Sequence, residues 1–128
     1  MGSVHANSAR DAVERYRDLC LEAGENLRES VVLRGVVRAF RLVVYVEMDS
    51  RLGRRVVKSI TEVTGNVTEE NIPVLQDLFT WEDGRLCCTG VRPYPLLGRM
   101  LDEAGFGYDQ VMRGEGLPPA WLQEAQQW

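Results

Sequence analysis

His5 is the only histidine in this 128-residue sequence, and it lies in the segment Val4-His5-Ala6-Asn7-Ser8. A histidine can act as a general base or as a metal ligand. Ser3, His5 and Asp11 have the residue types of a nucleophile, a base and an orienting acid, but nothing else supports acyl transfer and we predict no triad. A zinc site needs about four ligands, and a single histidine without spaced partners does not supply them. His5 is therefore a candidate catalytic residue only through the segment that contains it.

The three cysteines indicate structural roles rather than redox or metal chemistry. Cys87 and Cys88 are adjacent, so on a strand their side chains point to opposite faces, and Cys20 falls on the apolar side of a predicted helix. We expect all of them to be buried small hydrophobic residues. Three cysteines make no disulfide framework, which favours a reducing, cytoplasmic compartment.

Phosphate binding is not predicted for these residues. A phosphate cradle needs glycine-rich backbone and a lysine, in the pattern Gly-x-x-x-x-Gly-Lys-Ser/Thr. No such pattern occurs, and the only lysine is Lys58. Arg51, Arg54 and Arg55 cluster at a predicted turn, where a solvated loop is the default and a contact to an acidic partner surface is the alternative.

Composition predicts one globular domain that neither grips nucleic acid nor crosses a membrane. Hydrophobic residues make up 45% of the chain and charged residues 27%, ordinary values for a folded protein. Fifteen basic and nineteen acidic residues give a formal charge of −4, which disfavours broad binding to nucleic acid or anionic lipid. The longest apolar run, residues 42–46, is far shorter than the roughly 20 residues that span a bilayer, and no leader peptide is recognisable.

Helical periodicity predicts three helices. Asn7 and Ser8 supply capping residues for a helix over residues 9–23 that ends at Gly24, with Asp11 in a variant of the capping box. A second helix is expected at about 27–40 despite Gly35, and a third at about 96–104 after two prolines, with a possible further turn over 108–112.

The segments between the helices predict strands. Residues 42–46 form a continuous apolar run, which suggests a strand covered on both faces with parallel neighbours. Residues 55–63 return as a second strand, 65–71 form a polar loop, and 75–81 with 86–89 form another hairpin. The expected order is helix, helix, hairpin, hairpin, helix, followed by a flexible tail over 114–128.

Several separated segments resemble the C-terminal part of the CpaF/TadA-type secretion ATPases, within the type II/type IV secretion ATPase family. Val4-His5-Ala6-Asn7-Ser8-Ala9-Arg10-Asp11-Ala12 resembles the family's His box. Further matches occur in the same order as in the family. They are Arg55-Val56-Val57 with Ile60-Thr61-Glu62-Val63-Thr64-Gly65, Leu75-Gln76-Asp77-Leu78-Phe79, Thr89-Gly90-Val91-Arg92-Pro93 and Leu101-Asp102-Glu103-Ala104-Gly105-Phe106. Ordered matches over roughly residues 4–106 are more specific than one motif.

The resemblance implies an α/β fold, namely the C-terminal portion of a RecA-like ATPase core over residues 1–113, with the phosphate-loop half absent. The residue equivalent to His5 lies near the terminal phosphate of ATP in that family, which also uses magnesium. Because the phosphate loop and the acidic metal-holding strand are missing here, we expect no cofactor and no ATPase activity for these residues alone. The implied partners are ATPase subunits or the inner-membrane platform of a pilus, secretion or conjugation system. A diverged interaction domain and one half of a split motor remain as alternatives.

Overall fold

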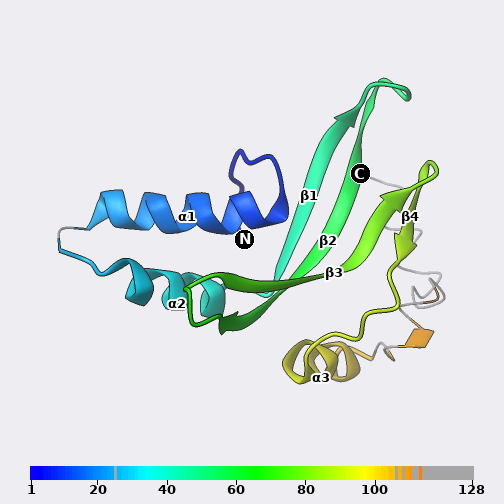
Figure 1. Ribbon diagram of the computed structural model, residues 1–128. Coiled ribbons are helices and arrows are strands. Elements are labelled where there is room, and N and C mark those ends of the chain that lie inside the picture. The colour runs from blue at the N-terminus through cyan, green and yellow to red at the C-terminus, as the bar shows by residue number, and fades with distance from the viewer. Residues whose placement is uncertain (25, 106, 108, 111–112, 114–128) are drawn as a thin grey trace. The chain divides into compact units, whose positions relative to one another are not determined.

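The computed structural model describes residues 1–24, 26–105, 107, 109, 110 and 113 (Figure 1). The chain divides into two compact units, residues 1–91 and residues 92–128. The first contains helices α1 (Ala9–Ala23) and α2 (Glu29–Ala39) and strands β1 (Leu42–Asp49), β2 (Arg54–Val67), β3 (Pro73–Glu82) and β4 (Arg85–Cys88); the second contains helix α3 (Pro95–Glu103). The predicted order of elements is confirmed. The predicted tail over 114–128 and most of the turn over 108–112 lie outside the described residues.

The four strands form one antiparallel sheet in the order β1-β2-β3-β4. Each strand therefore pairs with its neighbour in the sequence, and the two predicted hairpins join into a continuous meander through the β2–β3 pairing. The mixed α/β class is confirmed. No described helix is long and apolar enough to cross a membrane.

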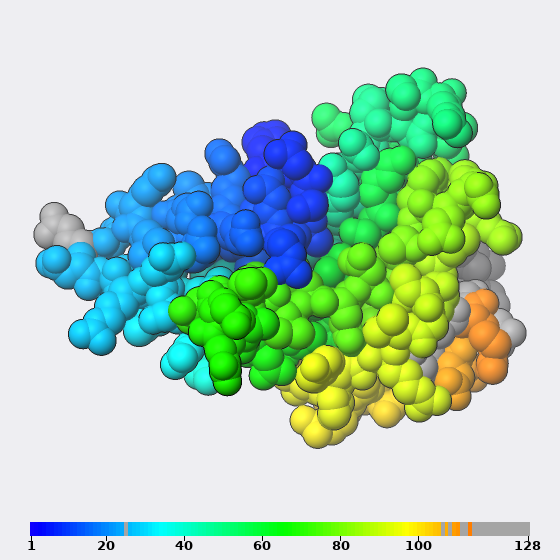
Figure 2. Space-filling model, in the orientation of Figure 1, coloured from blue at the N-terminus to red at the C-terminus, as the bar shows by residue number. Residues whose placement is uncertain are grey.

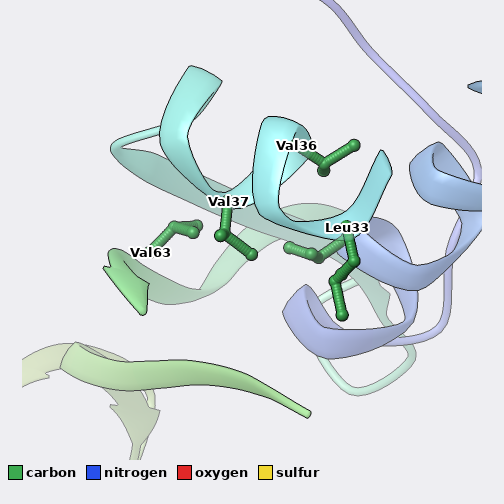
Figure 3. Packing of buried hydrophobic residues seen from close by; sticks show 5 residues of the cluster. Leu33, Val36, Val37 and Val63 are labelled. Atoms are coloured by element: carbon green, nitrogen blue, oxygen red, sulfur yellow. The ribbon is translucent and has the colours of Figure 1, made fainter. Parts of the chain in front are cut away.

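The core of the first unit lies between α2 and β2. Leu33, Val36 and Val37 of α2 form one buried cluster with Val63 of β2 and Val13 of α1, and Val37 is directed toward Val63 (Figure 3). The three α2 residues recur at helical spacing, so one side of the helix is apolar, and Leu33 is only 1% exposed. Burial of these side chains supplies the main driving force for packing the helices on the sheet.

Contacts at the two ends of α2 hold the middle of α1 against it. Tyr16 of α1 meets Phe40 edge-to-face, with ring centroids 4.8 Å apart. Arg17 of α1 forms an ion pair with Glu29 at the start of α2 at 3.1 Å, and another with Asp18 at 2.7 Å. The direction of α1 is thereby set by the helix that carries the core.

The prediction that the strand over 42–46 is covered on both faces is wrong. Strand β1 is an antiparallel edge strand, and Leu42, Val44, Val46 and Met48 are exposed on the face opposite the helices. The exposed positions in residues 42–46 are apolar like the half-buried ones, Val43 and Tyr45, so this stretch shows no alternation of apolar and polar residues. A continuous apolar run was therefore an unsafe sign of burial on both faces.

Strand β2 is longer than predicted, because it continues through the segment expected to be a loop. The predicted strand ended at Val63 and the loop began at Gly65, whereas β2 runs to Val67. The pairing with β3 shifts between Val63 and Val67, and Gly65 has a φ of +84°, a backbone conformation that suits glycine. The strand therefore passes through an irregularity at Gly65 that the sequence pattern shows only as a turn signal.

Replacement of Leu33 by alanine should lower the free energy of unfolding by about 2–5 kcal/mol, because it opens a cavity in the α2–β2 core. Urea unfolding followed by circular dichroism measures this change. Val31→Ala is the matched control, since Val31 lies on the same helix but is 62% exposed, and it should change stability by less than about 0.5 kcal/mol. Equal effects of the two variants would contradict the assigned core.

Candidate functional site

The predicted catalytic residue, His5, lies in the irregular segment that leads into α1. Residues 1–6 have no regular secondary structure, and the His5 side chain is exposed. Within the part of the chain that the structure describes, no hydrogen bond or ion pair to His5 is present. No group of three potential metal ligands among His, Cys, Asp and Glu occurs among the described residues either. His5 is thus accessible from solvent, without a neighbouring base, acid or metal set.

The segment after His5 is held by a capping arrangement at the start of α1. The Ser8 hydroxyl accepts a hydrogen bond from the backbone N–H of Asp11 at 3.0 Å. The Asp11 carboxylate in turn accepts from the backbone N–H of Asn7 at 2.7 Å and from its side-chain amide at 3.3 Å. In a standard capping box the acidic residue bonds the cap residue itself, and here it bonds the residue before. The predicted variant capping box is confirmed, and it orients the chain that carries His5.

Arg10 ties this end of α1 to the sheet. Its Nη1 donates to the carbonyl oxygen of Pro73, the first residue of β3, at 3.2 Å. Figure 2 shows the beginning of α1, in dark blue, directly against the strands. The helix start and the sheet therefore form one surface.

An open hollow of about 240 Å³ lies between the start of α1 and the strands. Its lining combines the helix start with side chains from β1, β2 and β3: Ser8, Ala9, Arg10, Tyr45, Ser59, Thr61, Leu75 and Asp77. Thr61 is only 2% exposed, and its hydroxyl donates to the Asp77 carboxylate at 2.6 Å. The hydroxyls of Ser59 and Thr61 are 3.2 Å apart, so a chain of polar groups crosses the sheet beneath α1.

The lining of this hollow offers hydroxyl and charged groups that can hydrogen-bond to another molecule. The Ser8 hydroxyl accepts from the backbone N–H of Asp11, the Ser59 and Thr61 hydroxyls bond each other, and Thr61 donates to Asp77, while the described lining holds no histidine or lysine to activate them. Arg10 and Asp77 give the hollow one charged group of each sign. We interpret it as a polar contact surface beside the capped turn of residues 7–11.

Sequence reasoning did not identify Tyr45, Ser59, Thr61 or Asp77 as residues of one site. Two of them lie in segments quoted for the resemblance, Thr61 in Ile60-Thr61-Glu62-Val63 and Asp77 in Leu75-Gln76-Asp77. Their hydrogen bond depends on the β2–β3 register, which pairs Thr61 with Asp77 directly. The only sequence signal for Thr61 and Asp77 was that each lies in a matched segment. The β2–β3 register that brings them together could not be read from the sequence.

A second open hollow, of about 560 Å³, lies beside the β1–β2 turn and contains the only lysine. Asp49 Oδ1 accepts from the backbone N–H groups of Arg51 at 2.9 Å and Leu52 at 3.1 Å, and Lys58 Nζ is 3.4 Å from its Oδ2. Lys58 also lies over the Trp81 ring, 5.9 Å from its centroid. The hydrogen bond from Leu52, with those from Arg51 and Lys58, holds the pKa of Asp49 below its ordinary value. Lys58 therefore has a structural role in the turn.

The cysteine prediction is wrong for Cys88. Cys20 and Cys87 are half-buried, as small apolar residues can be, whereas Cys88 is exposed near the end of β4. Adjacent residues on a strand face opposite ways, so only one of the pair can face the covered side. The arginines of the β1–β2 turn, Arg51, Arg54 and Arg55, are exposed as expected for a solvated loop.

Replacement of Ser8 by alanine should cost about 1 kcal/mol of stability, because the backbone N–H of Asp11 loses its side-chain acceptor. Chemical denaturation measures the loss, and amide hydrogen exchange in the first turn of α1 should rise with it. Ser3→Ala removes an exposed serine without a described hydrogen bond and should have no effect. An unchanged midpoint for Ser8→Ala would contradict the capping role.

Replacement of Asp49 by asparagine should flatten the acid end of the stability profile. A lowered pKa in the folded state contributes stability that is present above the unfolded pKa of about 3.9 and is lost as the pH falls through the folded value. The difference in urea midpoint between the parent and Asp49→Asn should therefore be larger at pH 7 than at pH 3. Asp83→Asn removes one exposed charge at the other hairpin turn and controls for the change in net charge. Parallel pH profiles for the parent and Asp49→Asn would contradict the assignment.

Three of the five segments noted in the sequence, residues 4–12, 55–65 and 75–79, thus contribute side chains to one hollow. Neither a scan against protein-family models nor a search of curated proteins finds a match to this chain. The comparisons assign no family, and the functional argument rests on the residues themselves.

Proposed function

We propose that this chain is a C-terminal segment of a CpaF/TadA-type, type II/type IV secretion ATPase-like protein, with a RecA-like origin for its α/β fold. It acts by association with ATPase subunits or with an inner-membrane platform protein, in the cytoplasm. It does not hydrolyse ATP by itself. The segments from Val4 to Ala12, Ile60 to Gly65 and Leu75 to Phe79 carry the resemblance to that family.

The observation that carries this proposal is the convergence of those segments on the hollow at the start of α1. The His-box segment contributes Ser8 and Arg10, the second segment contributes Thr61, and the third contributes Asp77. Thr61 of the second segment bonds Asp77 of the third, and Arg10 of the first segment bonds Pro73 at the start of β3, 63 residues away in the sequence. The β2–β3 pairing by itself brings the second and third segments together, so the support for the proposal comes from the first segment, which joins them from the start of α1.

The absence of hydrolysis follows from the residues that nucleotide chemistry requires. The 128 residues contain no Gly-x-x-x-x-Gly-Lys-Ser/Thr pattern, and Lys58 is paired with Asp49. His5 stands exposed without a partner to hold or activate a water molecule among the described residues. In the proposed role His5 would act only toward phosphates that another polypeptide supplies.

A second candidate function is a self-contained protein-interaction domain that has diverged from the ATPase lineage. The observation in its favour is the closed core of Val13, Leu33, Val36, Val37 and Val63, which lies entirely within the first compact unit. Such a core allows cooperative folding without another chain.

Binding of ATP and Mg²⁺ should be undetectable when the purified chain is titrated by calorimetry, because no phosphate cradle is present. Mixed with a phosphate-loop-bearing secretion ATPase polypeptide from the same cell, the chain should co-elute with it in size-exclusion chromatography. Arg10→Glu should weaken this association by about tenfold, since it reverses the one positive charge of the hollow. Arg15→Glu, an exposed arginine on the same helix, is the matched control and should bind like the parent.

The other outcomes separate the alternatives. A folded chain that ignores the ATPase polypeptide contradicts the proposal and favours the interaction domain. Co-elution with a gain of ATP hydrolysis that His5→Ala abolishes would identify half of a split motor. Micromolar ATP binding by the chain alone would contradict the proposed absence of a nucleotide-binding surface.

A further inference from the structure

Strand β1 presents an open, apolar sheet edge. It spans Leu42–Asp49, pairs only with β2 in the described structure, and exposes Leu42, Val44, Val46 and Met48, with Val44 54% exposed. Proteins usually protect such edges with lysine, proline, a bulge or a very short strand. None of these devices is in β1: it contains no lysine, proline or glycine, and the extra residue at the β1–β2 irregularity, Lys58, belongs to β2.

The backbone of β1 is arranged to accept another strand. The carbonyl oxygen of Arg41 accepts from the Val63 N–H at 2.9 Å, so the odd-numbered residues that follow it along β1 direct their backbone groups toward β2. The even-numbered residues then direct their N–H and C=O groups toward the open edge. No described residue outside the β1–β2 pairing bonds to the backbone of Leu42, Val44 or Val46. Apolar side chains and unpaired backbone groups therefore occupy the same positions.

We propose that two copies of this chain pair through β1, antiparallel, about a twofold axis at Val44. In this register Val44 faces Val44 of the second copy, Leu42 faces Val46, and Arg41 faces Glu47 on both sides of the axis. An interface of this kind uses the same patch on both copies and needs a self-complementary pattern. The apolar pairs lie on one face and the two charge pairs on the other.

The charges favour a second copy as the partner and select the register. Glu47 is exposed and has no ion pair among the described residues. Nη1 of the Arg41 guanidinium donates to the carbonyl oxygens of Arg38 at 2.6 Å and Phe40 at 3.0 Å, and no ion pair to Arg41 is present among the described residues either. An opposite-charge pair directly across two strands is stabilising. Moving the axis to Tyr45 would put Glu47 opposite Val43 and Arg41 opposite Asp49, which Lys58 and the turn backbone already engage. The axis at Val44 instead pairs Arg41, which precedes β1, with Glu47, so that both side chains gain an opposite charge.

Pairing of this kind would join two four-stranded sheets into one eight-stranded sheet. The contact is one strand wide, and small interfaces of this type form weak or transient complexes. We therefore expect a monomer–dimer equilibrium that depends on concentration. The pairing does not depend on the proposed function, because it needs only the open edge of β1 and Arg41, of which Tyr45 alone lines the hollow at α1.

The first test is sedimentation of the full 128-residue chain over a concentration series reaching about 100 µM, where a weak dimer is populated. Val44→Lys should weaken dimerisation at least tenfold, because it places two like charges at the axis and protects the edge. Val31→Lys, a lysine at an equally open valine on α2, is the control and should leave the dimer unchanged. Thermal melts verify that both variants remain folded.

The second test isolates the register. Glu47→Lys and Arg41→Glu should each dimerise about tenfold more weakly than the parent, since each homodimer has like charges facing twice. An equimolar mixture of the two should recover a heterodimer, because both of its charge pairs are again opposite. A monomeric parent at the highest concentration, or a dimer insensitive to Val44→Lys, would overturn the proposal. A dimer broken by Val44→Lys but without recovery in the mixture would overturn the register.

Discussion

The packing of α2 on β2 is the interaction on which the rest of the first unit depends. Leu33, Val36 and Val37 belong to one buried cluster with Val63 across this contact. Helix α1 is positioned by its contacts to α2 and its flank, namely Tyr16 with Phe40 and Arg17 with Glu29. The start of α1 then falls over β2 and β3, where Arg10 reaches Pro73. The capped turn of residues 7–11 and the hollow beneath it are thus positioned by a hydrophobic contact that shares only Leu75, packed at its edge, with the hollow.

Two surfaces of the same sheet have different character. On the helix-facing side, the buried Thr61 hydroxyl donates to the exposed carboxylate of Asp77 at 2.6 Å, and no buried side-chain polar atom among the described residues lacks a partner. The opposite side of β1 carries exposed valine and leucine side chains. Buried polar pairs fix the register of neighbouring strands, whereas exposed apolar side chains on an edge favour contact with other molecules. The proposed ATPase association centres on the hollow at the start of α1 and the proposed self-pairing on the open edge of β1, and Tyr45 of β1 adjoins both.

The sequence was sufficient where one residue type has one local effect. Ser8 with Asp11 placed the start of α1, and the glycine and proline signals separated the strands and introduced α3. It failed where the answer depends on neighbours. The apolar run of β1 could not distinguish a central strand from an edge strand, Gly65 signalled a turn inside a continuing strand, and the meeting of Thr61 with Asp77 required the strand register. The candidate site divides in the same way: the matched segments can be recognised in the sequence, but the hollow that residues 4–12, 55–65 and 75–79 share cannot.

The meander has a consequence for how the chain reaches its native state. Every strand of the sheet pairs with the strand next to it in sequence, and α2 packs on a strand that begins fifteen residues beyond the helix end at Ala39. Such local connections keep the entropy of loop closure small, and proteins dominated by them fold quickly. The sheet can grow by successive addition of strands during synthesis, with β1 waiting only for β2. A chain built this way can acquire its core early, whatever larger assembly it later enters.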